Sequence, residues 1–181
     1  MRWAPGARER LARAAFELFT ERGYTETTIP EITARAGLTT RTFFRYFADK
    51  REVIFGGSEI PETAARLIRE APEGTADEVL RTVLHRVADD QFEGRKGETA
   101  AWRELIAEND SLRDRDARKR ADLVRAATAA FLDRGFRPLE AVLHAETGAL
   151  VFHVALDHWV AQPGDQPLSE LMDEVLRQVK S

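Results

Sequence analysis

The chain contains no cysteine, so disulfide bonds and thiolate metal sites are excluded. Absence of disulfides is usual in a reducing compartment, and we expect a cytoplasmic protein. The sequence also has no apolar run that approaches the ~20 residues of a membrane-spanning helix. Its first residues combine arginines with glutamates and include no long apolar segment. We therefore expect neither a signal peptide nor a contact with the membrane.

Runs of β-branched residues are scarce too, whereas Ala, Leu, Arg and Glu dominate. Apolar residues recur at helical spacing along nearly the whole chain, which predicts an all-α fold. The expected helices cover residues 6–22, 29–36, 40–47, 50–69, 76–92, 98–109, 111–134, 138–160 and 168–179. Gly56, Gly57 and Pro61 interrupt the range 50–69, so a kink or break is expected near them.

The chain has fewer basic than acidic residues, with 27 Lys and Arg and 31 Asp and Glu, which gives a net charge of -4. Residues 1–55 nevertheless hold 10 basic against 7 acidic residues, and the remainder holds 17 against 24. Only the N-terminal part is therefore suited to approach a polyanion such as DNA. We predict two domains, residues 1–50 and residues 51–181.

Two short helices joined by a tight turn are predicted within the first domain. Thr28 followed by Glu31 is a capping-box pattern, and Pro30 is tolerated in a first helical turn. Gly37 ends this helix, and Thr39 is a good N-cap for the next one. This arrangement predicts a helix-turn-helix, whose second helix can enter the major groove of DNA.

The stretch GLTTRTFFRYF, residues 37–47, divides into two faces on this interpretation. Phe43 and Phe47 are four residues apart and share one face, suited to pack in the domain core. Arg41 and Arg45 lie on other faces, where a guanidinium can bond guanine bidentately or pair with phosphate. The alternative is an ordinary three-helix subdomain with a solvated arginine face.

The segment TTIPEITARAGLTTRTFFRYFADKREVIF resembles the N-terminal domain of the TetR family of transcriptional regulators. The matching positions are Thr28, Ala36-Gly37, Thr39, Thr42, Phe43 to Phe47 and Lys50. A looser similarity to the regulatory domain of actinobacterial members lies in WRELIAENDSLRDRDARKRADL. The resemblance implies DNA contacts at Thr28, Thr39, Thr40, Arg41, Phe44, Arg45, Tyr46 and Lys50.

Phe44 departs from the family pattern, which usually has tyrosine at that position. Phenylalanine has no hydroxyl to donate to phosphate, although its ring can contact a thymine methyl or pack against sugar. Lys50 would act on the DNA backbone as a point charge. We interpret Thr42 as a structural residue of the turn.

The resemblance further implies a C-terminal domain that dimerises and encloses a small-molecule pocket. We expect residues 138–160 and 168–179 of two subunits to form a four-helix interface, because small and apolar residues line these helices. Candidate pocket residues are Trp102, Leu105, Ile106, Phe131, His144, Phe152 and Trp159. For each of these seven, a place in the ordinary core is the competing interpretation.

The histidine spacing indicates neither a metal site nor a catalytic centre. His144 and His158 lie four helical turns apart, and His153 precedes His158 by five residues, off the favourable spacing of four. We expect no metal and no cofactor, and we interpret the histidines as core or interface residues; contact of His144 or His153 with a ligand is the alternative. No Ser-His-Asp arrangement or glycine-rich phosphate loop is present, so we do not expect an enzyme.

These observations favour a homodimeric repressor, released from a near-palindromic operator when an effector bound in the second domain moves the helix 50–69. Repression is what the resemblance implies, since no residue indicates the sign of regulation. A DNA-binding regulator without a small-molecule effector is the first alternative, favoured by a body without a cavity of a few hundred Å³. A helical protein-binding adaptor is the second.

Overall fold

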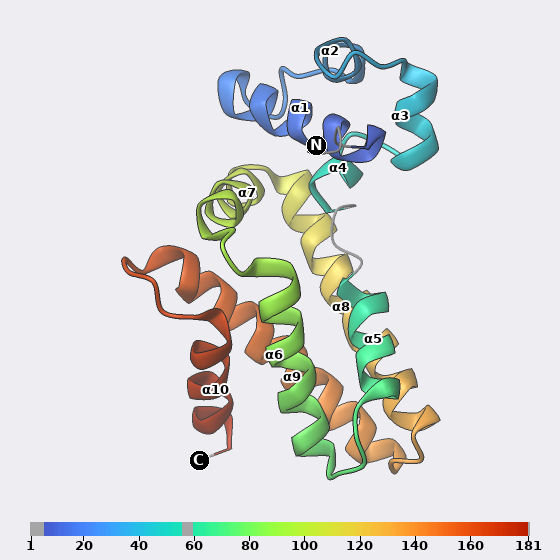
Figure 1. Ribbon diagram of the computed structural model, residues 1–181, viewed down its shortest axis with the longest axis vertical. Coiled ribbons are helices and arrows are strands. Elements are labelled where there is room, and N and C mark those ends of the chain that lie inside the picture. Colours follow the sequence, from blue (N-terminus) through green and yellow to red (C-terminus); the bar gives the residue numbers. More distant parts are fainter. Residues whose placement is uncertain (1–5, 56–59, 181) are drawn as a thin grey trace, which may run out of the picture. The chain divides into compact units, whose positions relative to one another are not determined.

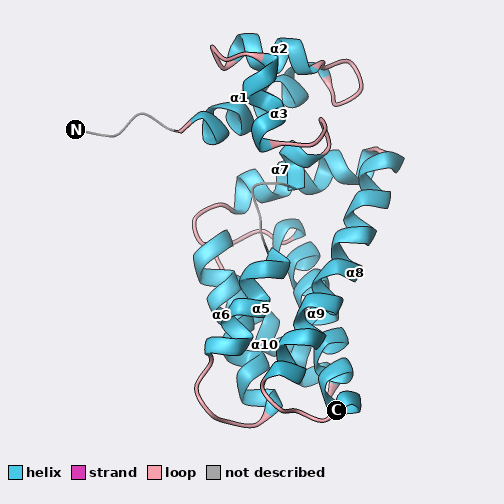
Figure 2. Cartoon of the chain, turned by 90° about the vertical axis from the view of Figure 1, so that its right-hand side faces the viewer, coloured by secondary structure: helices cyan, strands magenta, loops and turns pink. Residues whose placement is uncertain are grey.

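The computed structural model describes residues 6–55 and 60–180, and within these ranges the secondary structure is helical, without strands (Figures 1 and 2). In chain order the helices are α1 (Ala7–Arg22), α2 (Ile29–Arg35), α3 (Thr40–Tyr46), α4 (Glu52–Phe55), α5 (Ile60–Glu70), α6 (Ala76–Phe92), α7 (Lys96–Glu108), α8 (Asp110–Asp133), α9 (Pro138–Ala161) and α10 (Leu168–Val179). The predicted all-α fold is confirmed.

Most of the predicted helix ends agree with the structure to within two residues. The ranges 76–92 and 168–179 are reproduced by α6 and α10. The predicted helix 50–69 corresponds instead to two elements, α4 and α5. The expected interruption falls at residues 56–59, which lie outside the described residues, and Pro61 lies in the first turn of α5, where its missing N–H costs nothing.

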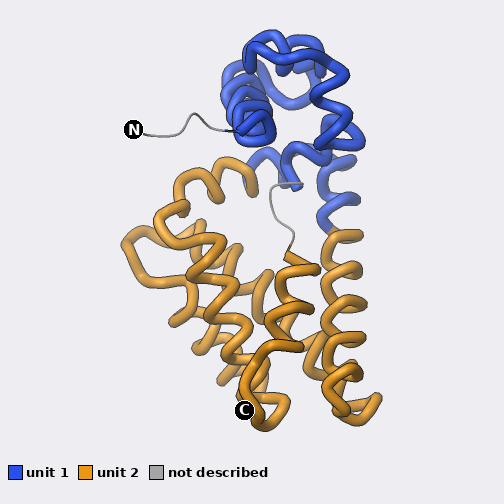
Figure 3. Tube along the Cα trace, turned by 45° about the vertical axis from the view of Figure 1, so that its right-hand side comes forward, with its two compact units in different colours: residues 1–58, 104–116 blue, residues 59–103, 117–181 orange. Residues whose placement is uncertain are grey.

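The chain forms two compact units (Figure 3), and each has its own core. Unit 1 comprises residues 1–58 and 104–116, and unit 2 comprises residues 59–103 and 117–181. Unit 1 is thus larger than the predicted first domain, because it includes the end of α7 and the beginning of α8. The boundary between the units falls within these two helices.

The core of unit 1 is built where α1, α2, α3 and α4 meet. The buried stripe of α1 contains Leu11 and Phe19, and Ile32 of α2 packs there with no exposed surface. Phe43 and Phe47 lie in contact, with ring centroids 5.4 Å apart. Leu112 of α8 is also fully buried in this unit, so the segment 104–116 contributes to its core.

The core of unit 2 is a single apolar cluster to which α5, α6, α8, α9 and α10 contribute. Helix α9 is central to it, because it packs against both α6 and α10. Small residues let these helices approach closely. At Gly148, an added Cβ atom would lie only 2.7 Å from the tip of the Leu80 side chain on α6.

Helix α9 is the one described helix that is long and apolar enough to cross a membrane by length and composition. This finding differs from the expectation that no part of the sequence approaches a membrane-spanning helix. In the structure the helix lies within unit 2, and residues such as Val151, Phe152 and Leu156 are buried against its neighbours. Burial therefore accounts for the apolar residues on that side of α9, whereas Leu139 and Leu143 are exposed.

Candidate nucleic-acid interface and ligand cavity

The helix-turn-helix of unit 1 consists of α2, a turn and α3, and the predicted caps set both helix ends. Thr28 and Glu31 form a reciprocal capping box, in which the backbone N–H of Thr28 donates to Glu31 Oε2 at 2.8 Å. Gly37 adopts a positive φ of 63° in the turn, a conformation that favours glycine. The Thr39 hydroxyl then accepts a hydrogen bond from the backbone N–H of Thr42 at 3.2 Å. Caps at both ends fix the entry to the turn and the start of α3.

Helix α3 has one buried and one exposed side, as the sequence predicts. Phe43 has no exposed surface and Phe47 only 2%. Thr40, Arg41, Phe44, Arg45 and Tyr46 are exposed. Because the two phenylalanines anchor the helix in the core, its opposite side is left to carry side chains that can reach a partner.

The exposed side of α3 carries positive charge beside aromatic rings. Arg41 makes no hydrogen bond or ion pair with the described part of the chain. Arg45 Nη2 donates to the Tyr46 hydroxyl at 2.9 Å, and its guanidinium lies 4.8 Å from the centre of that ring. Phe44 is 54% exposed, a large value for a phenylalanine. An exposed aromatic ring between two arginines suits a surface that contacts nucleic acid.

The three predicted threonine contacts lie at helix N-termini and are exposed. Thr39 accepts its cap bond and shares a second hydrogen bond with the hydroxyl of Thr42, at 3.0 Å. Thr28 donates its hydroxyl proton to Glu31 at 2.8 Å, and the two hydrogen bonds from Thr28 keep the pKa of the Glu31 carboxyl below its ordinary value. Thr40 has no polar partner in the described residues. Of the three, Thr40 therefore has its hydroxyl most available.

Lys50 lies differently from the sequence prediction. Its ammonium donates to the backbone carbonyls of Tyr24 and Thr27, each at 2.7 Å, and lies 4.2 Å from the centre of the Tyr24 ring. Burial lowers the pKa of this lysine, and the nearby Glu26 and Glu31 carboxylates oppose that shift. A lysine whose ammonium is directed inward positions the segment between α1 and α2. This geometry suits a positioning role, and the phosphate contact of Lys50 stays a prediction.

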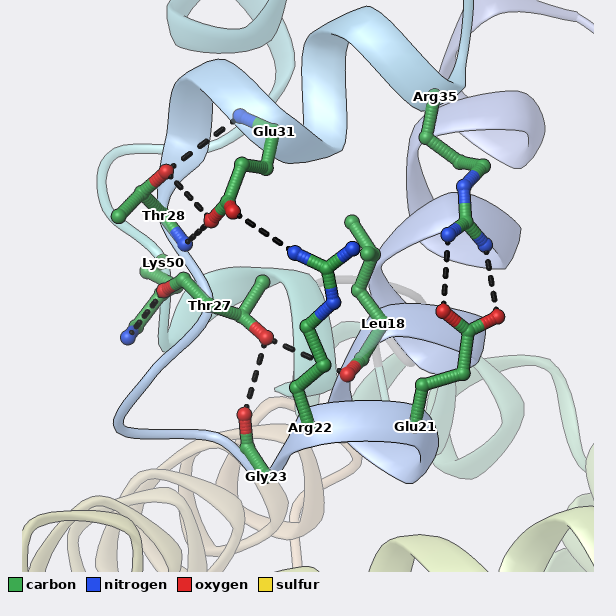
Figure 4. A network of polar contacts seen from close by, with 9 residues as sticks. All are labelled: Leu18, Glu21, Arg22, Gly23, Thr27, Thr28, Glu31, Arg35 and Lys50. Atoms are coloured by element: carbon green, nitrogen blue, oxygen red, sulfur yellow. Dashed lines mark hydrogen bonds and ion pairs between the residues drawn. The ribbon is translucent and has the colours of Figure 1, made fainter.

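Ion pairs on the surface of unit 1 hold α1 against α2 (Figure 4). Arg35 forms two parallel hydrogen bonds with the Glu21 carboxylate, at 2.9 and 2.8 Å. Hydrogen bonding to Arg35 lowers the pKa of Glu21. Arg22 meets Glu31 at 3.0 Å, which ties the end of α1 to the capping box of α2. Arg22 and Arg35 are therefore both engaged in ion pairs within unit 1.

Buried Thr27 adds a polar contact that the sequence did not indicate. Its hydroxyl lies 2.9 Å from the carbonyl oxygen of Gly23 and 3.3 Å from that of Leu18, so the end of α1 accepts its proton (Figure 4). The same residue's carbonyl accepts from Lys50. Thr27 thus connects α1 to Lys50, which lies two residues before the start of α4.

Within unit 1, the start of α8 is joined to α4 by an ion pair. Arg115 Nε donates to Glu52 Oε1 at 2.6 Å, and both side chains are mostly shielded from solvent. By its alternating charges alone, the run RDRDARKR around Arg115 is typical of a solvated helix face with pairs four residues apart. A pair 63 residues apart in sequence has no local signal that could have revealed it.

Unit 2 contains a cavity of about 40 Å³ between α5, α6, α8 and α9. Phe131, His144 and Phe152, three of the seven predicted pocket residues, line it. The other four do not. Leu105 and Ile106 belong to unit 1, Trp102 lies on α7, and buried Trp159 donates its Nε1–H to the Gln166 carbonyl at 2.8 Å. Helical periodicity placed these four on apolar faces but did not indicate what those faces contact.

No group of three or more His, Asp or Glu side chains in the described ranges is arranged to hold a metal ion. His144 uses its two ring nitrogens within the protein, as detailed below. His153 Nδ1 lies 2.7 Å from the Ala149 carbonyl. His85 Nε2 lies 3.1 Å from Asp173 Oδ1, close enough for an ion pair but without the geometry of a hydrogen bond. Each histidine named here has a partner inside unit 2.

The geometry of α2, the turn and α3 defines a helix-turn-helix domain of the DNA-binding class. Residues 11–55 match the family described as bacterial regulatory proteins, tetR family. The chain is 41% identical over 96 residues to the HTH-type transcriptional regulator TcmR of Streptomyces glaucescens, a match that covers 50% of this chain and 42% of TcmR. Residues 11–55 therefore form a domain of the TetR type, and the match to TcmR spans less than half of that relative's length.

Solved structures agree over nearly the whole chain. FadR of Thermus thermophilus, a TetR-family transcriptional repressor solved in complex with lauroyl-CoA, is 26% identical with a TM-score of 0.52, covering 96% of this chain and 93% of its own. SmeT, solved in complex with triclosan, is 20% identical with a TM-score of 0.64, covering 95% of this chain and 90% of its own. The similarity to SmeT, at 20% identity, shows a shared fold only.

Proposed function

We propose that this protein is a transcriptional regulator that binds double-stranded operator DNA through the exposed side of α3. The observation that carries the proposal is the division of that helix, with Phe43 and Phe47 buried and Arg41, Phe44 and Arg45 exposed. Arg41 is free to bond a base edge, since it has no partner in the described residues. Thr40 adds a free hydroxyl at the helix N-terminus, where backbone N–H groups favour phosphate.

The regulator acts as a homodimer in this proposal, because two recognition helices are needed to read the halves of a near-palindrome. Support comes from an exposed apolar face on α9. Leu139, Leu143 and Leu150 are 72%, 55% and 37% exposed, at spacings that follow one side of the helix. The apolar side of α10 is largely buried within its own subunit, and Val179 is its exposed apolar residue. The interface therefore centres on α9, with α10 at its side.

A small-molecule effector bound in the cavity of unit 2 would regulate DNA binding. Helix α8 supports this, because one continuous helix supplies Leu123 and Phe131 to the cavity and Arg115 to the ion pair with Glu52 in unit 1. The effector must bind more tightly to the form of the protein that does not bind DNA. Repression, released by the effector, is the mode we propose.

A regulator without a small-molecule effector is the second candidate, and the size of the cavity favours it. The cavity has about 40 Å³, whereas pockets for drug-sized ligands measure roughly 300–1,000 Å³. An effector would have to open the cavity as it enters. Both candidates share the same DNA-binding surface.

The test is selection of binding sites from a random duplex library with purified protein at a stated salt concentration. We expect enrichment of a near-palindrome with two half-sites. Arg41→Ala should lose ~1–3 kcal/mol of specific binding and relax one position in each half-site. Arg118→Ala, which removes an exposed arginine from the unit 2 part of α8, is the matched control and should leave the site unchanged. No enriched site with the wild-type protein, with or without added apolar compounds, would refute the DNA-binding proposal.

A further inference from the structure

The cavity of unit 2 is almost entirely apolar. Fifteen residues line it, and all of them are aliphatic, aromatic or glycine except His144. No lysine or arginine is among them. The lining residues come from α5, α6, α8 and α9 (Figure 1), and all of them lie in unit 2. A ligand inside would therefore meet hydrocarbon wherever it contacts the lining, apart from His144.

The single polar residue of the lining has its hydrogen bonds occupied. His144 Nδ1 lies 2.8 Å from the Glu140 carbonyl, and Nε2 lies 2.8 Å from Asp77 Oδ1. The same carboxylate oxygen lies 2.6 Å from Lys180 Nζ. The imidazole thus offers its ring face and carbon edge to the cavity, since both nitrogens are directed to protein acceptors. No group of the lining is left free to bond a ligand.

An anionic group in this cavity would be buried without a free counter-charge, because the lining has no lysine or arginine and His144 is already paired with Asp77. Charges are taken from water into an apolar site only when they are paired and hydrogen-bonded, and the lining supplies neither partner. An uncharged apolar molecule loses nothing comparable on entry and gains by removal of its surface from water. The lining of the cavity therefore disfavours a charged ligand.

The dimensions of the cavity require that it expand around such a ligand. About 40 Å³ is room for roughly three waters at ~10–15 Å³ each, and a cavity that admits benzene measures ~150 Å³. Space can be gained by movement of flexible side chains over the small residues of α9. Leu80, whose tip approaches Gly148, is placed to make such a movement.

We propose that the cavity is the site of an uncharged, predominantly apolar ligand that binds by opening it. This assignment rests on the proposed function of unit 2 as the effector-binding part of the protein, and it specifies the chemical class of that effector. Compounds that carry a carboxylate, sulfonate or phosphate on the buried part are excluded.

A matched pair of fluorescent probes tests the assignment on the full-length protein. N-phenyl-1-naphthylamine is uncharged, and 1-anilinonaphthalene-8-sulfonate has the same ring skeleton with an added sulfonate. Both emit strongly in apolar surroundings, so each titration gives a dissociation constant. We expect the uncharged probe to bind at least about tenfold more tightly, because the sulfonate would be buried unpaired.

Two glycine substitutions locate the binding. Gly148→Ala places a methyl group against the Leu80 side chain in the lining, and should weaken binding of the uncharged probe about tenfold. Gly97→Ala makes the same chemical change on exposed α7, where an added Cβ meets nothing within 4 Å, and should leave the affinity unchanged. Alanine favours a helix over glycine at both positions, so both variants are expected to fold.

Equal or tighter binding of the sulfonate overturns the assignment, as does failure of the uncharged probe to bind. The assignment is also overturned if both glycine variants lose the same affinity for the uncharged probe, or if neither variant loses any. In either case the probe occupies another surface. The site selection described above is run on the same preparation. If the protein selects an operator but binds no probe, the DNA-binding proposal stands and the ligand assignment fails. If it binds the probe but selects no operator, only the proposed function is refuted.

Discussion

Replacement of Lys50 by methionine separates two roles for this residue, a contact with the DNA backbone and a positioning role inside unit 1. Methionine keeps an unbranched apolar stem but donates no hydrogen bond. In Lys50→Met the Tyr24 and Thr27 carbonyls lose their ammonium donor, and the Tyr24 ring loses its cation. The variant therefore removes every contact by which this side chain holds the segment between α1 and α2.

The expected loss of stability follows from the two short hydrogen bonds. A hydrogen bond to a charged group contributes ~1.5–3 kcal/mol, and water can replace part of it because the lysine is only partly buried. We expect Lys50→Met to lower the free energy of unfolding by about 2 kcal/mol. Urea unfolding of the full chain measures this value, and hydrogen exchange at residues 24–28 shows whether the loss is local.

The salt dependence of DNA binding distinguishes the two roles. Each cation that neutralises a phosphate contributes about -0.9 to the slope of log K against log[salt]. If Lys50 is a positioning residue, the affinity of Lys50→Met falls but its slope stays within a few tenths of the wild-type value. Arg45→Met, which removes an exposed cation from α3, is the matched control and should reduce the slope by about 1 per subunit. A Lys50→Met protein of unchanged stability, with its slope reduced as in the control, would refute the positioning role.

Three further predictions concern the core, the dimer and acid stability. Phe43→Ala empties a fully buried site and should cost ~3–5 kcal/mol of stability, measured by urea unfolding; a cost under 1 kcal/mol would contradict the placement of that ring in the core. Leu143→Glu introduces like charges at the proposed interface and should weaken dimerisation at least about a hundredfold in sedimentation velocity, whereas Leu132→Glu, on the exposed side of α8, should not. Hydrogen bonding to Lys180, with a further contribution from His144, keeps the pKa of Asp77 below its ordinary value of 3.8. This carboxylate therefore stabilises the fold above about pH 4 and ceases to do so as the pH falls through its lowered pKa. The stability lost in Asp77→Asn should accordingly be larger at pH 7 than at pH 2, and an equal loss at both values would be inconsistent with this reasoning.

The sequence by itself determined the helices and the two faces of α3. Caps and stops act over three or four residues, so Thr28 with Glu31, Gly37 and Thr39 could be interpreted without a structure. The spacing of Phe43 and Phe47 indicated which side of α3 is buried for the same reason. Helical periodicity is a local property, and it specifies which face of a helix is apolar.

Only the tertiary structure decided what each face and each long side chain meets. The acceptors of Lys50 are backbone carbonyls more than twenty residues upstream, and no side-chain pattern encodes them. The inclusion of residues 104–116 in unit 1 and the pair of Arg115 with Glu52 depend on contacts between distant segments. The cavity likewise forms from four helices whose apolar stripes look alike in sequence, so the lining could be assigned only once those helices were packed together.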